Sequence, residues 1–197
     1  MELPEVTPSR LGGDVAVDFF NTVDWRLDPA RRHERLASYL HLLAWVMQVG
    51  LISPDVAQAL AERSTRSAPD ASERELADVI ALRDHTYDVL TADAALAVLE
   101  RELSAAHAAS TLYRGSAAWE WSPRGLELST PRHLIALEFG RLVTSEHVML
   151  LRRCADQHCG WVFLDTSRQR NRRWCSAADC GNRNRVRAHY ARSRFGA

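Results

Sequence analysis

Residues 154–180 read CADQHCGWVFLDTSRQRNRRWCSAADC and contain all four cysteines of the chain. The cysteines form two pairs of the same spacing, Cys154-x4-Cys159 and Cys175-x4-Cys180, with fifteen residues between the pairs. Two such pairs can bring four thiolates around a tetrahedral metal ion, which would also stabilise a short, loop-rich segment. We therefore predict one structural zinc ion per chain, bound by Cys154, Cys159, Cys175 and Cys180. Two disulfides or four buried free thiols are the alternatives.

The rest of the sequence predicts a reducing location, which favours metal ligands over disulfides. Residues 1–8 carry two glutamates and lack the basic end and the apolar run of a signal peptide. No apolar stretch approaches the roughly 20 residues that a membrane span needs. We expect a cytoplasmic protein without a membrane partner.

The formal net charge of zero conceals a strong asymmetry along the chain. Residues 152–197 hold eleven arginines and three acidic residues, a net charge of +8, and the rest of the chain carries −8. A basic segment of this kind indicates an anionic partner.

Hydrophobic periodicity predicts a mainly α fold with a small β-hairpin. Apolar residues recur at helical spacing in segments that lie at 36–49, 54–63, 73–92, 94–110 and 130–143. Gly50 lies where a helix C-cap is expected, and Ser53-Pro54 is typical of a helix start. Residues 119–129 alternate between apolar and polar around a turn at 122–125, which predicts the hairpin. We divide the chain into a mostly helical amino-terminal domain, residues 1–144, and a carboxy-terminal treble-clef-like zinc finger, residues 145–197.

Within the predicted finger, a helix is expected to begin at Ser145 and to run into Cys154. Residues 160–164 should form a strand, residues 172–174 its return strand, and residues 182–194 a basic helix, with Val186 and Tyr190 anchoring that helix to the finger. This helix and the loop before it are the candidate contact with nucleic acid. An extended backbone would present Arg168, Arg170 and Arg172 on one face. The full set of candidate residues is Arg168, Arg170, Arg172, Arg173, Asn182, Arg183, Asn184, Arg185, Arg187 and Arg192. The alternative is a solvated basic surface, or arginines paired with the acidic amino-terminal domain.

The sequence also resembles a known family. Residues 152–192, from RRCADQHC to RAHYAR, resemble the CGNR zinc finger, named for the tetrapeptide that is Cys180-Gly181-Asn182-Arg183 here. The segments VDFFNTVDWR (17–26) and LLAWVMQVGLI (42–52), with the Trp119–Trp121 hairpin, resemble the ABATE domain that normally precedes this finger. The resemblance implies a stress-induced bacterial transcription regulator whose finger binds zinc and DNA, with the four cysteines as the zinc ligands.

Several polar and aromatic residues of the amino-terminal part could line a pocket for a small-molecule effector. They are Asp18, Asn21, Thr22, Trp25, Trp45, Trp119 and Trp121. The alternative is that Asp18 and Asn21 brace neighbouring elements and that the tryptophans belong to the core. We find no phosphate loop, nucleophile elbow or open metal triad and expect no enzyme. An adaptor that binds RNA or protein is the main alternative function, and a homodimer is compatible with either.

Overall fold

The chain folds into two compact units, and neither is a continuous piece of sequence. The computed structural model describes residues 2–66, 69–92, 94–115 and 118–195. The first unit holds the residues up to Pro8 together with Arg35–Ser145, and the second holds Ser9–Glu34 together with everything from Glu146 onward. The sequence places one boundary at residue 144, whereas the structure groups the early segment Ser9–Glu34 with the carboxy-terminal part.

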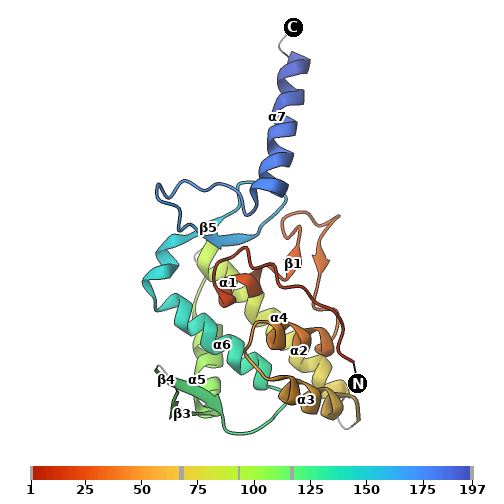
Figure 1. Ribbon diagram of the computed structural model, residues 1–197, viewed down its shortest axis with the longest axis vertical. Helices are drawn as coiled ribbons and strands as arrows, with labels where there is room; N and C mark the ends of the chain where they lie inside the picture. Colours follow the sequence, from red (N-terminus) through yellow and green to blue (C-terminus); the bar gives the residue numbers. More distant parts are fainter. Residues whose placement is uncertain (1, 67–68, 93, 116–117, 196–197) are drawn as a thin grey trace. The chain divides into compact units, whose positions relative to one another are not determined.

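The first unit is a helical bundle with one hairpin (Figure 1). Its helices are α2 (Tyr39–Gln48), α3 (Pro54–Arg66), α4 (Pro69–Ala92), α5 (Ala97–Ala108) and α6 (Thr130–Val143). Helix α2 lies in the core, where Trp45 and Leu42 are almost completely buried. Its end at Gly50 is as predicted, because Gly50 takes a φ of 83°, a conformation that glycine adopts without a side-chain clash. The Ser53 hydroxyl accepts a hydrogen bond from the Val56 amide, as expected for an N-cap.

The hairpin of the first unit differs from the prediction in its position. Strand β3 (Ser110–Arg114) pairs antiparallel with β4 (Trp119–Pro123), so that Leu112 lies opposite Trp121. The turn therefore precedes Trp119, where the Gly115 amide donates to the Ala118 carbonyl, and does not lie at 122–125. Residues 110–114 follow helix α5 directly, so hydrophobic periodicity does not separate this strand from the helix predicted at 94–110.

The second unit is built from short elements and one long helix (Figure 1). In chain order they are α1 (Val15–Phe20), β1 (Val23–Asp24), β2 (His33–Glu34), the 3-10 helix η1 (Glu146–Leu150), β5 (Leu151–Arg153), β6 (Val162–Leu164), the π-helical turn η2 (Ala177–Gly181) and α7 (Asn182–Phe195). Strands β1 and β2 pair with each other, as do β5 and β6.

Two predictions for the finger region were wrong. The strand that pairs with β6 is β5, which precedes the first cysteine pair, and residues 172–174 form no strand. The chain enters Cys154 from β5 and not from an α-helix, because only the short 3-10 helix η1 follows Ser145. The broader prediction is confirmed: the chain is mainly helical, with two-stranded sheets and a carboxy-terminal cysteine cluster. Among the described residues no helix is long and apolar enough to cross a membrane.

Candidate zinc site and nucleic-acid interface

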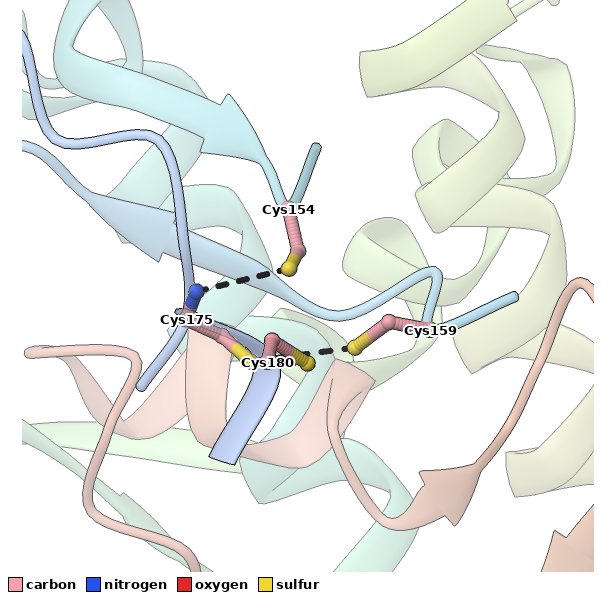
Figure 2. A group of neighbouring side chains, drawn as sticks. All are labelled: Cys154, Cys159, Cys175 and Cys180. Atoms are coloured by element: carbon pink, nitrogen blue, oxygen red, sulfur yellow. Dashed lines mark hydrogen bonds between the residues drawn. The ribbon is translucent and has the colours of Figure 1, made fainter. Parts of the chain in front are cut away.

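The four cysteines of the carboxy-terminal part converge on one point (Figure 2). All four side chains are buried, and their sulfur atoms lie within 4.8 Å of one another. The Cys175 Sγ atom is 3.7 Å from that of Cys159 and 3.5 Å from that of Cys180. Thiolates bound to zinc at about 2.3 Å in a tetrahedron would lie about 3.8 Å apart. The donor set and its spacing therefore fit a zinc ion held by four thiolates.

Each cysteine pair is carried by a turn wide enough for four intervening residues. In the turn between β5 and β6, Asp156 accepts a hydrogen bond from the His158 amide through its side chain and one from the Cys159 amide through its carbonyl. In the second pair, the Gly181 amide donates to the Ser176 carbonyl five residues earlier, which closes one π-helical turn. The wider spacing thus has a separate structural cause in each pair.

Thiol ionisation links metal binding at this cluster to pH. In the metal-free protein, burial raises the pKa of the Cys180 thiol, and hydrogen bonding to Cys154 raises that of Cys159. A metal ion has to displace the protons that these thiols retain. The affinity for zinc is therefore expected to fall as the pH is lowered.

The early segment Ser9–Glu34 completes the finger. The side-chain amide of Asn21 donates to the Val162 carbonyl at 2.9 Å, and its oxygen accepts from the Val162 amide at 3.0 Å. The Leu164 amide donates to the Gly12 carbonyl, and the Trp161 indole donates to the Val23 carbonyl. Asn21 and Gly12 therefore satisfy backbone groups of β6 that β5 leaves unpaired.

The same segment also reaches the first cysteine turn. The Arg26 amide donates to the Cys159 carbonyl at 3.0 Å. Gly160 takes a φ of 73°, and a Cβ atom there would lie 2.8 Å from the Cβ of Arg26. Glycine therefore suits this position both for its backbone conformation and for the close approach of the two segments.

The remaining pocket candidates of the second unit also have local partners. Asp18 accepts hydrogen bonds from the Ser9 hydroxyl and the Gly12 amide, and burial raises its pKa. The Thr22 hydroxyl donates to the Phe19 carbonyl. Trp25 lies against two guanidinium groups, 3.9 Å from Arg31 and 4.4 Å from Arg183. These contacts support the bracing alternative for Asp18 and Asn21.

The other three pocket candidates belong to the first unit. Trp45 is enclosed in its core, whereas Trp119 and Trp121 are exposed on β4. Trp121 packs edge-on against His107 of helix α5. These three side chains do not share one environment, and the effector pocket stays a prediction.

One buried acid joins the first cysteine turn to the start of α7. The Asp156 side chain has no exposed surface, and its Oδ2 atom lies 3.2 Å from Arg183 Nε, 2.6 Å from Asn184 Nδ2 and 3.5 Å from Arg187 Nη1. Burial alone would raise the pKa of Asp156, but hydrogen bonds from the His158 amide, Asn184 and Arg183 outweigh it and lower the pKa. This carboxylate fixes the first turn and a half of the helix.

The arginines of the loop before the helix differ in their surroundings. Asp165 accepts hydrogen bonds from the Ser167 and Arg172 amides and so closes residues 165–172 into a loop. The prediction that Arg168, Arg170 and Arg172 lie on one face required an extended segment. The segment is not extended, and Arg170 takes a φ of 48°. The Arg172 guanidinium packs over the Phe163 ring at 4.1 Å and donates to the Leu11 and Cys175 carbonyls. By contrast, Arg168, Arg170 and Arg173 are exposed.

Beyond its first turn, helix α7 presents all its described side chains to solvent. Every residue from Arg185 to Ser193 is exposed. The prediction that Val186 and Tyr190 anchor the helix is wrong, because these side chains are 45% and 67% exposed. The arginines of this stretch are Arg185, Arg187 and Arg192, with no acidic residue among them. Asn182 at the start of the helix is also exposed.

Sequence reasoning missed Asp156 and the part that the early segment plays in the finger. Asp156 is one of only three acids in the basic end of the chain and lies between two cysteines, which was the available signal. The hydrogen bonds between Asn21 and Val162 join residues 141 positions apart, and the sequence of one chain carries no signal for such a pairing.

Comparison with known families matches both parts of the chain. A family model described as "CGNR zinc finger" matches residues 151–193. The ABATE model, described as "Putative stress-induced transcription regulator", matches residues 13–146, more than half of the chain. The search of curated proteins finds no match to the chain. The predicted order, an ABATE domain followed by a CGNR finger, is confirmed.

Proposed function

Because the chain belongs to the ABATE family and carries a CGNR zinc finger at its carboxy-terminal end, we propose that it regulates transcription by binding DNA through helix α7. The observation that carries the proposal is the exposed stretch Arg185–Ser193, which presents three arginines and no acid. Side chains of this kind contact phosphates from a helix that lies along a DNA groove. The exposed Arg168, Arg170 and Arg173 of the loop before the helix are further candidates for phosphate contacts.

The zinc ion has a structural task in this proposal. One ion per chain, bound by four thiolates, has no open coordination position and supplies no reactive water. Its effect is to hold the two cysteine turns together and so to fix the start of α7. Metal analysis of the purified protein should find one zinc per chain, and disulfides in place of metal would contradict this.

Duplex DNA binding at several salt concentrations tests the proposal. Each arginine that neutralises a phosphate adds about 0.9 to the slope of log affinity against log salt. Replacing both Arg185 and Arg192 with alanine should lower the affinity at low salt and reduce the slope by about 1 to 2.

The matched control is Arg66→Ala with Arg101→Ala, which removes the same charge from exposed side chains of the first unit. Equal losses in the two double variants would mean that net charge and not α7 governs binding. Structured RNA in a parallel assay separates a DNA regulator from the RNA-binding alternative, because tighter RNA binding would contradict the proposal.

A further inference from the structure

Arg183, the last residue of the Cys180-Gly181-Asn182-Arg183 segment, makes its described contacts inside the second unit. Its Nη2 atom lies 2.8 Å from the Sγ atom of Cys180, and its Nε atom lies 3.2 Å from Asp156 Oδ2. Its guanidinium carbon is 4.4 Å from the centre of the Trp25 ring. The side chain is only 29% exposed although it belongs to the first turn of a helix whose later residues are open to solvent.

These contacts join three separate stretches of chain. Asp156 belongs to the first cysteine turn, Cys180 to the second, and Trp25 to the early segment Ser9–Glu34. A guanidinium group can do this because its donors are arranged in a fixed fork and its flat face stacks on an aromatic ring. Asn184 supports the arrangement, since its Nδ2 atom also reaches both Asp156 Oδ2 and the Cys180 carbonyl.

The position of Arg183 suits a cysteine thiolate bound to zinc. Four thiolates around one Zn²⁺ leave a net charge of −2. A cationic donor at the sulfur of Cys180 offsets part of that charge and orients the ligand, as partners of metal ligands commonly do. The same side chain also contacts the carboxylate of Asp156, so one residue bonds both to the cysteine cluster and to the acid that holds the start of α7.

We infer that Arg183 is a positioning residue, which ties the first turn of α7 to the zinc site and does not itself contact nucleic acid. The inference rests on the proposed function only in taking DNA as the partner that α7 binds. The tie itself depends on the contacts with Cys180, Asp156 and Trp25, and it is tested without DNA.

The first test replaces zinc with Co²⁺, whose sulfur-to-metal charge-transfer band reports on the ligands. Arg183→Met removes the hydrogen bond to Cys180, which makes that sulfur a stronger electron donor and should shift the band to lower energy. Competition with a chelator should show a zinc affinity about 10- to 100-fold weaker than in the original protein. Arg192→Met is the control, because it removes the same charge from an exposed position of the same helix. It should leave both the band and the affinity unchanged.

The second test measures hydrogen exchange of the amides in residues 182–187 of the zinc-loaded protein. Arg183→Met should speed exchange there by at least about tenfold, whereas Arg192→Met should not. Should Arg183→Met fail to fold, Arg183→Lys decides the question. Lysine keeps the charge but cannot bridge Cys180 and Asp156 as a fork does, so the band and the exchange should still change, by less than in Arg183→Met.

Two outcomes would overturn the inference: an unchanged band and unchanged exchange in the folded Arg183 variant, or equal effects of the Arg183 and Arg192 variants. DNA binding separates this inference from the proposed function. If the proposed function is wrong but Arg183 does connect α7 to the zinc site, the original protein will not bind DNA, and Arg183→Met will still alter its Co²⁺ spectrum.

Discussion

At the scale of single residues, polar side chains of the early segment act as partners for the backbone of the finger. Asn21 is 1% exposed, and its amide makes the two hydrogen bonds to Val162 that a neighbouring strand would otherwise supply. In the finger itself, the buried Asp156 braces the start of α7 by accepting hydrogen bonds from the side chains of Arg183 and Asn184. A buried polar residue in an apolar segment is therefore compatible with two functions, a ligand pocket or a brace, and here its partners are protein atoms.

The Asn21 brace leads to a prediction about stability. Asn21→Leu should lower the free energy of unfolding of the second unit by about 2 kcal/mol or more, because it leaves the buried amide and carbonyl of Val162 unpaired. Denaturant unfolding followed by tryptophan fluorescence would measure the change, because Trp161, one of the six tryptophans, bonds to Val23 between the same two segments.

Asn171→Leu is the control for this substitution, because Asn171 is exposed and its side chain bonds only to that of Gln169 among the described contacts. Equal stability of the two variants would show that Asn21 is not a brace. An effector that binds to the original protein and not to Asn21→Leu would then favour the pocket.

At the scale of elements, the sequence predicted long helices and metal ligands better than short strands. A helix such as α4 repeats its apolar pattern over several turns, and the cysteine pairs are recognised by spacing alone. Strand β6 lies within the predicted strand at 160–164, but β5 has only three residues, too few to show a period of two, and its pairing with β6 depends on the turn that holds Cys154 and Cys159. The partner of the Trp119 strand, β3, was missed because it follows helix α5 directly.

Helix packing in the first unit gives a prediction at this scale. Arg132 of α6 donates to Glu75 of α4 and to Glu102 of α5, and all three side chains are at most 20% exposed. Arg132→Met would leave two largely buried carboxylates without this partner and should lower the free energy of unfolding by about 2 to 3 kcal/mol. Calorimetry of the two proteins would measure this difference in the free energy of unfolding.

Arg66→Met serves as the control for Arg132→Met, because its 75% exposed side chain pairs with Glu62 on one helix and should change stability by less than about 0.5 kcal/mol. An Arg132 variant as stable as this control would mean that apolar packing alone holds the three helices together.

At the scale of the whole molecule, the compact units do not follow the order of the chain. The sequence divides naturally at the start of the cysteine region, because composition and charge change there. The structure instead assigns Ser9–Glu34 to the unit that contains the cysteines. Hydrogen bonds of Gly12, Asn21, Val23 and Arg26 with the finger carry this assignment, and three of the four use backbone atoms of the early segment, whose partners no side-chain pattern reveals.

Removal of zinc should therefore affect two distant stretches of sequence together. Without the ion, the four thiols no longer hold the two cysteine turns, and the edge of β6 that Asn21 and Gly12 cover loses its support. Hydrogen exchange after chelation should show faster exchange in residues 151–181 and, to a similar extent, in residues 9–34. Helices α4, α5 and α6 of the first unit provide the internal control and should keep their protection. Exchange that rises only in residues 151–181 would mean that Ser9–Glu34 folds independently of the metal, and the finger would then be the contiguous module that the sequence predicts.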